Sequence, residues 1–191
     1  MKKLYYLTLF LLSSVCLIIA ETEVSGNITT DTTWDLAGGP YVVTGDVDVR
    51  RGATLTIENG VEVQFGSGAH IDLGYNYDSN KNGHLVADGV NFTAVNNNNN
   101  WMIYARNAST LSLSNCVFDG GNTGKDGLQL LDSSVASITH CTFRNFSDYA
   151  VDNGSSATGQ VFTDNTLEDS AAGYNFNPRS LTGISFSGNT F

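Results

Sequence analysis

Residues 109–118 read Ser-Thr-Leu-Ser-Leu-Ser-Asn-Cys-Val-Phe, and residues 135–143 read Val-Ala-Ser-Ile-Thr-His-Cys-Thr-Phe. Two further stretches share this form: Gln-Val-Phe-Thr-Asp-Asn-Thr-Leu at 160–167 and Ile-Ser-Phe-Ser-Gly-Asn-Thr-Phe at 184–191. Each contains an alternating strand, a break at Cys or Asn, and a second short strand that ends on Phe or Leu. Such self-similarity at a fixed period is typical of repeat proteins.

The last residue of each motif marks the period. These anchors are Phe65, Phe92, Phe118, Phe143, Leu167 and Phe191, and the intervals between them are 27, 26, 25, 24 and 24 residues. A solenoid has to keep such a period, because each coil lies on the one below at the strand spacing of about 4.8 Å. A third strand is expected in each coil, at residues 70–73, 101–104, 127–130, 149–151 and 174–176. The sequence therefore predicts an all-β fold, a parallel β-helix of about six to seven coils of 24–27 residues with the anchors stacked inside.

The phase of the repeat assigns two further sets of positions. The residues two before the anchors are Val63, Val90, Cys116, Cys141, Asn165 and Asn189. We expect the chain to bend there, with Asn in the left-handed conformation and its amides hydrogen-bonded as an asparagine ladder. Cys116 and Cys141 share this slot as two stacked thiols or as a disulfide. The residues after three anchors, Asp119, Arg144 and Glu168, point outward as a ladder of alternating charge.

The segment Gly-Ala-Thr-Leu-Thr-Ile-Glu-Asn-Gly-Val-Glu-Val-Gln-Phe at 52–65 resembles the opening coil of right-handed parallel β-helix repeat proteins of bacterial and archaeal surfaces. The segments 83–93, 115–118 and 140–143 resemble later coils, so the resemblance covers about residues 40–191. It implies a right-handed helix and a secreted or cell-surface protein. Some relatives act on or bind acidic polysaccharides, but a fold alone does not assign an activity.

The first twenty residues have the composition of a secretory signal peptide. Lys2 and Lys3 precede an apolar stretch over 5–19, and Ala20 is a small residue suited to cleavage. Removing residues 1–20 takes away those two lysines and changes the net charge from −10 to −12. An acidic chain of this kind disfavours nucleic acid and anionic membranes as partners, and no membrane insertion is expected after cleavage. Residues 21–191 then form a single β-helix domain.

The C-terminus falls on an anchor, Phe191, with no capping segment after it. An open end of a solenoid exposes unpaired strand edges. The sequence therefore predicts either a C-terminally truncated chain or end-to-end self-association.

Candidate catalytic residues are few. The segment Gly-Lys-Asp-Gly-Leu at 124–128 faintly resembles a polygalacturonase coil, with Asp126 at the acid position, and the next coil contains Asp148 and Asp152. The adjacent Asp pair and the Gly-His-Gly segment of those enzymes are absent, so we expect no catalytic site. Arg106 is expected at a solvated corner. The alternative is a polysaccharide-active enzyme, a lyase or a glycoside hydrolase, or a fragment of one.

Two loop regions remain as binding candidates. Asp78, Asn80 and Asn82 resemble the start of a calcium loop, but the late carboxylate is missing, so weak calcium binding or a plain surface turn is expected. The aromatic residues Tyr75, Tyr77, Trp101 and Tyr104 form either a sugar-stacking platform or local packing. The leading hypothesis is a non-catalytic extracellular protein that binds a polysaccharide or cell-surface glycan, or serves as an adhesin-like structural module.

Overall fold

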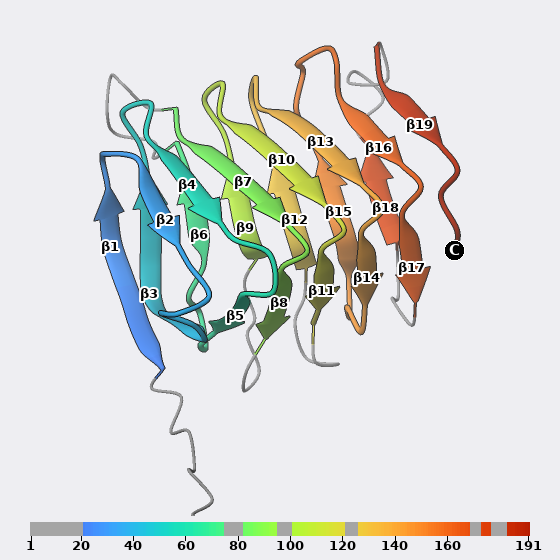
Figure 1. Cartoon of the computed structure of the whole chain (residues 1–191). Coiled ribbons are helices and arrows are strands. Elements are labelled where there is room, and N and C mark those ends of the chain that lie inside the picture. The colour runs from blue at the N-terminus through green and yellow to red at the C-terminus, as the bar shows by residue number, and fades with distance from the viewer. Residues whose placement is uncertain (1–20, 75–81, 95–100, 121–125, 169–172, 177–182) are drawn as a thin grey trace, which may run out of the picture.

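The structure is a computed structural model that describes residues 21–74, 82–94, 101–120, 126–168, 173–176 and 183–191. For Trp101, Asp126 and residues 173–176 it describes the backbone alone. These residues form parallel strands that wind into a solenoid, as Figure 1 shows. The all-β parallel solenoid predicted from the repeat is confirmed. Within the described residues, no helix is long and apolar enough to cross a membrane.

One face of the solenoid is a seven-stranded sheet. Its strands are β2 (Thr32–Trp34), β4 (Thr54–Ile57), β7 (His84–Asp88), β10 (Thr110–Ser114), β13 (Val135–Thr139), β16 (Val161–Thr163) and β19 (Ser185–Ser187). None of its six strand pairings contains a register shift. The register stays regular although paired residues lie from 23 to 30 positions apart in the sequence, so the loops between coils absorb the variation.

The other two faces belong to one twelve-stranded sheet. The long strand β3 (Tyr41–Val49) joins them, because its start pairs with β5 and its end pairs with β6. One half contains β5 (Glu62–Phe65), β8 (Asn91–Ala94), β11 (Val117–Asp119), β14 (Thr142–Arg144) and β17 (Thr166–Glu168). The other half contains β6 (Ile71–Leu73), β9 (Trp101–Ala105), β12 (Asp126–Leu130), β15 (Tyr149–Asn153) and β18 (Gly173–Phe176). Strand β1 (Thr22–Ile28) pairs along β3.

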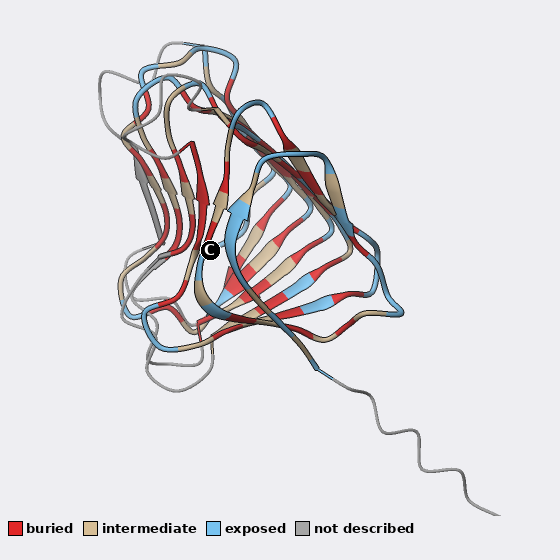
Figure 2. Ribbon diagram, turned by 90° about the vertical axis from the view of Figure 1, so that its left-hand side faces the viewer, coloured by how far each residue is buried: buried red, intermediate tan, exposed pale blue. Residues whose placement is uncertain are grey.

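Each complete coil holds three strands, and Figure 2 shows the resulting three-sided outline along the solenoid axis. Five coils of the described residues are complete, from β4–β5–β6 to β16–β17–β18. This is fewer than the predicted six to seven. The difference lies at the two ends. Strands β2 and β3 form a further turn without three separate strands, because β3 covers two faces, and β1 and β19 belong to incomplete coils.

The anchors form an aromatic stack in the core. Phe92, Phe118 and Phe143 occupy register-paired positions on β8, β11 and β14, and all three are fully buried. Their ring centroids lie 4.6 and 4.8 Å apart with interplanar angles of 11° and 7°. Leu167 continues the stack on β17. Phe191, by contrast, is 74% exposed, because no described residue lies beyond it on the stack.

The predicted phase is wrong at the first anchor. Phe65 pairs with Ala94, and Val63 pairs with Phe92, so the coil between them is two residues longer than the anchor spacing implies. A shift of two residues along a strand leaves every side chain on its original face. The apolar alternation of Val63 and Phe65 is therefore compatible with either register.

The corner geometry also differs from the prediction. In five coils the residue with positive φ lies one position before the expected slot: Gly89, Asn115, His140, Asp164 and Gly188. In the first coil it is Gly60, three positions before Val63, because the register there is shifted by two residues. Asn165 itself is buried inside the corner, where its Oδ1 accepts from the Cys141 backbone N–H at 2.8 Å. Its Nδ2 donates to the Ile138 carbonyl at 2.9 Å and to Asn189 Oδ1 at 3.0 Å. Asn165 therefore serves to hydrogen-bond buried backbone groups, and the left-handed conformation falls on the preceding residue, Asp164.

The predicted charge ladder lies on β11, β14 and β17. Asp119 pairs in register with Arg144, and Arg144 with Glu168. Arg144 Nε donates to Asp119 Oδ2 at 2.8 Å. The Asp119–Arg144 ion pair therefore links two neighbouring coils.

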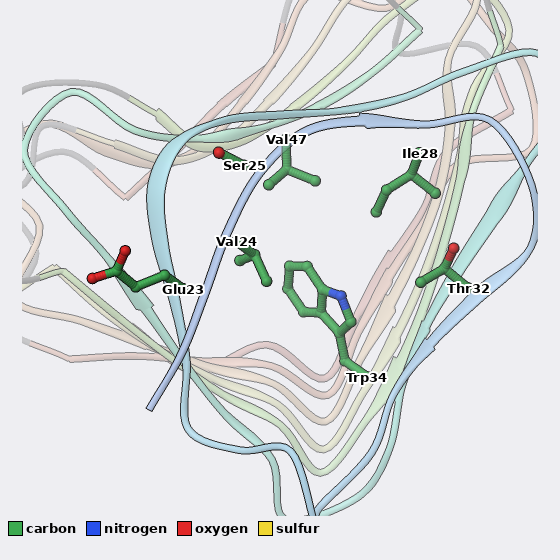
Figure 3. A pocket seen from close by; sticks show the side chains of 7 residues that line it. All are labelled: Glu23, Val24, Ser25, Ile28, Thr32, Trp34 and Val47. Carbon is green, nitrogen blue, oxygen red and sulfur yellow. The ribbon is translucent and has the colours of Figure 1, made fainter. Parts of the chain in front are cut away.

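The N-terminal end of the core contains a cavity of about 300 Å³. Figure 3 shows the Trp34 side chain pointing into the ring formed by the first coil, with Val24, Val47 and Ile28 around it. The Trp34 ring also stacks on Tyr41, with centroids 4.9 Å apart. The cavity is therefore the end of the apolar core, incompletely filled.

Candidate functional site

The outer face of the second half of the large sheet carries a continuous line of polar side chains. Register pairs Asp48 on β3 with Asp72 on β6, Asp72 with Tyr104 on β9, Tyr104 with Gln129 on β12, and Gln129 with Asp152 on β15. We call these five residues the polar row. It arises because each lies between two residues of an inward-facing alternation, such as Val47 and Val49. The row places one polar side chain per coil at intervals of about 4.8 Å.

An arginine and a tyrosine are held together at the centre of this face. Arg106 Nη2 donates to Asp72 Oδ2 at 3.0 Å. The Arg106 guanidinium carbon lies 4.3 Å from the centroid of the Tyr104 ring. A charge-assisted hydrogen bond and a cation–π contact together fix both side chains. The expectation that Arg106 occupies a solvated corner is wrong, because Asp72, 4% exposed, requires a cationic partner.

A histidine and a carboxylate lie beside this pair. His70 Nδ1 is 3.2 Å from Asp46 Oδ1. The His70 and Tyr104 ring centroids are 6.2 Å apart, so imidazole, phenol and guanidinium groups border one another. These groups can donate and accept hydrogen bonds and present aromatic surface.

Burial changes the acidity of three groups on this face. Desolvation raises the pKa of Asp48, opposed by the Arg50 charge. Desolvation also raises the pKa of Asp72, opposed by Arg106. The pKa of Tyr104 is raised by burial and lowered less by Arg106. Perturbed acids gathered on one surface are common at functional sites and also occur in structural networks.

Several buried polar atoms on this face lack a hydrogen-bond partner. They are Asp72 Oδ1, Arg106 Nε and Gln129 Oε1. The other end of the Gln129 amide is used, since its Nε2 donates to Asp152 Oδ2 at 3.2 Å. Two acceptors and one donor are therefore buried without a partner beneath this face, among the described residues.

Only some of the binding residues proposed from sequence belong to the described part of the chain. Tyr75, Tyr77, Asp78 and Asn80 lie outside the described residues, so the aromatic platform and the calcium loop stay predictions. Asn82 is described, and its Nδ2 lies 3.5 Å from His84 Nε2. Within the described part of the chain, no three His, Cys, Asp or Glu side chains are arranged to hold a metal ion.

Tyr104 is the member of the aromatic set whose side chain is described, and it lies on the polar row. The backbone of Trp101 pairs with that of Asp126 on β12.

The three candidate acids do not share one position. Asp152 lies on the polar row, opposite Gln129. Asp126 lies three residues before Gln129, so it is not aligned with Asp152. Asp148 is half-buried in the turn before β15. Asp126 and Asp152 are therefore offset from each other along the strands.

Sequence reasoning missed Asp48, Asp72 and the role of Arg106. The signal that indicates them is a single polar residue between two apolar ones, at Val47-Asp48-Val49 and again at Ile71-Asp72-Leu73. Its recurrence 24 residues later matches the period of the coils.

A comparison with protein-family models identifies a right-handed β-helix region over residues 20–191. The chain belongs to the right-handed β-helix family. Searches of curated proteins and of solved structures found no match. Family membership gives the handedness of the solenoid, and the chemistry has to be inferred from the side chains of this β-helix itself.

Proposed function

We propose that this β-helix is an extracellular glycan-binding protein, and that an extended polysaccharide chain lies across its polar row. The observation that carries the proposal is the fixed Tyr104–Arg106 pair at 4.3 Å, set within a row that supplies one polar side chain per coil. An aromatic ring held by its neighbours loses little freedom when a sugar stacks on it. The signal-like N-terminal segment supports an extracellular location.

The repeat distance of the row supports an extended ligand. Neighbouring strands are about 4.8 Å apart, which is comparable to the length of one pyranose unit in an extended chain. A polysaccharide perpendicular to the strands would thus meet Tyr104, Gln129 and Asp152 at successive sugars, while buried Asp72 holds Arg106 in place. Hydroxyl groups of those sugars would pair with the carboxylate and amide oxygens.

The charge of the face favours neutral sugars or amino sugars over polyuronates. Asp48, Asp72 and Asp152 line the row, and Arg106 is already paired with Asp72. The mature chain is also strongly acidic. A polyanion would meet like charge along its length, whereas a cationic sugar would meet a complementary potential.

A matched pair of arginine variants tests this proposal. Arg106 and Arg144 each form an ion pair with an aspartate, but they lie on different faces of the solenoid. On a glycan array and by titration calorimetry, Arg106→Ala and Tyr104→Ala should weaken binding about tenfold or more, because each removes an anchor at the centre of the site. Arg144→Ala should bind as the wild type does. Equal affinity in all three variants would show that the ligand lies elsewhere.

A polysaccharide-active enzyme is the second candidate, and one observation favours it. Asp48 and Asp72 are register neighbours, and burial raises the pKa of both carboxyls. A glycoside hydrolase needs a protonated carboxyl near an ionised one. Release of reducing ends from neutral or amino-sugar polysaccharides, lost in Asp72→Asn, would replace the binding proposal with this one. Glycan binding without any release favours the first.

A further inference from the structure

Two cysteines occupy equivalent places on neighbouring coils. Cys116 follows β10 and Cys141 follows β13, and these strands pair in register up to Ser114 and Thr139. The next strands pair in register again from Val117 and Thr142. Both cysteine side chains are 1% exposed. The two thiols therefore lie directly above one another inside the same corner.

The sulfur atoms have few other partners. Cys116 Sγ lies 3.2 Å from the Ser114 carbonyl oxygen, and Cys141 Sγ lies 3.4 Å from the Thr139 carbonyl oxygen. A hydrogen bond between the two thiols lowers the pKa of Cys116 and raises that of Cys141. The pair thus has one thiol that ionises more readily and one that remains protonated.

We propose that Cys116 and Cys141 are a modification site at which oxidation forms a disulfide between neighbouring coils. Parallel strands lie about 4.8 Å apart, and disulfides join residues whose Cα atoms are roughly 4.4 to 6.8 Å apart. The in-register strand pairings before and after the cysteines already align the two residues with each other. A secreted chain folds where disulfides persist.

The chemistry is thiol–disulfide exchange with a carrier disulfide, such as oxidised glutathione or a dithiol oxidase. The Cys116 thiolate attacks one carrier sulfur, the carrier S–S bond breaks, and a mixed disulfide forms. The Cys141 thiol then loses its proton as its sulfur attacks Cys116 Sγ, and the second carrier thiol is released. One S–S bond forms and one breaks, and the carrier receives the two electrons and the two protons.

The same slot in the following coils supports a role in linking coils. Asn165 and Asn189 occupy it there, and Asn165 Nδ2 donates to Asn189 Oδ1 at 3.0 Å. Val90 occupies it in the coil before Cys116, where Val117 N–H donates to its carbonyl. On successive coils this position therefore holds an apolar side chain, then the two cysteines, then two asparagines joined by a hydrogen bond. A disulfide would make the middle link covalent.

Two measurements test the proposal on the chain carrying Cys16→Ser, in which Cys116 and Cys141 are the two remaining thiols. For protein isolated from an oxidising compartment of the expression host, iodoacetamide in denaturant should add no label before reduction and two labels after it. Two labels before reduction would overturn the claim that the site is oxidised there. Fully reduced protein incubated with oxidised glutathione should lose two hydrogens and carry no glutathione. Persistent thiols or stable glutathione adducts would overturn the claim that the two sulfur atoms are placed to form a disulfide.

The consequence of the cross-link has its own readout. Relative to the reduced protein, the oxidised protein should show a midpoint of thermal unfolding about 5 °C or more higher, because the bridge restricts the unfolded chain. The double variant Cys116→Ala/Cys141→Ala should show no shift on the same treatment. A disulfide that forms without any rise in the midpoint would contradict its role as a staple between coils.

Discussion

Removal of one ring from the core stack should cost a large part of the stability of the molecule. Phe118 is fully buried between Phe92 and Phe143, at centroid distances of 4.6 and 4.8 Å. Replacing a buried Phe with Ala typically costs about 3–5 kcal/mol, through lost burial and the cavity left behind. Phe118→Ala also removes two stacked contacts, each contributing about 0.5–1.5 kcal/mol beyond area burial. We therefore expect a loss near the upper end, about 5 kcal/mol.

The assay is urea unfolding followed by far-ultraviolet circular dichroism. The free energy of unfolding should fall by the amount above while the denaturant slope stays constant, because the surface exposed on unfolding hardly changes. Phe118→Leu is the matched control, since it keeps most of the volume and should cost less than about 1.5 kcal/mol.

A double-mutant cycle with Phe143→Ala isolates the ring-to-ring contact. The coupling energy between Phe118 and Phe143 should be about 0.5–1.5 kcal/mol. A loss below about 2 kcal/mol in Phe118→Ala, or zero coupling, would refute the stacked arrangement.

Three further predictions concern the corner, the polar row and the ends of the solenoid. Asn165→Ala should cost at least about 2 kcal/mol in urea unfolding, because buried backbone groups at Cys141 and Ile138 lose their partner. Asp72 binds its proton more tightly in the folded chain, so its contribution to the free energy of unfolding falls as pH rises from 3.8 through the raised pKa. The free energy of unfolding, measured from pH 3 to 7, should fall less with rising pH in Asp72→Asn than in the wild type. Parallel curves for the two proteins would contradict the raised pKa of the buried Asp72 carboxyl. Self-association through the apolar surface of Phe186 and Phe191, which are 43% and 74% exposed, should appear in light scattering and weaken in Phe191→Asp; a monomer at every concentration would count against it.

The period of the repeat was enough to predict the fold and the ring stack from Phe92 onward. Each coil must place the same kind of side chain at the same corner, so the pattern is redundant over several copies. The first register was mispredicted because a two-residue shift preserves the facing of Val63 and Phe65, and period alone carries no information on that shift. The left-handed residues were displaced by one position for a related reason: both Asp164 and Asn165 tolerate that conformation, and packing decides between them.

The candidate site was harder to predict than the fold. Tyr104 was expected as a binding residue, but its partner Arg106 was not, because their contact depends on Asp72 from the preceding coil. Side chains that meet across neighbouring coils of this site are 23–34 residues apart in sequence, and only the register brings them together. Alternation indicates which residues face outward, whereas ion pairing and burial of the carboxylate depend on what covers them.

The most direct test of the central claim is the place where a glycan binds. Amide chemical shifts of the protein, recorded while a neutral or amino-sugar oligosaccharide bound by the wild type is added, report that place residue by residue. We predict that the largest changes cluster on β9, β12 and β15, around Tyr104, Gln129 and Asp152, and disappear in Tyr104→Ala. Changes centred on the seven-stranded sheet or on the cavity beside Trp34, with the polar row unaffected, would contradict the account.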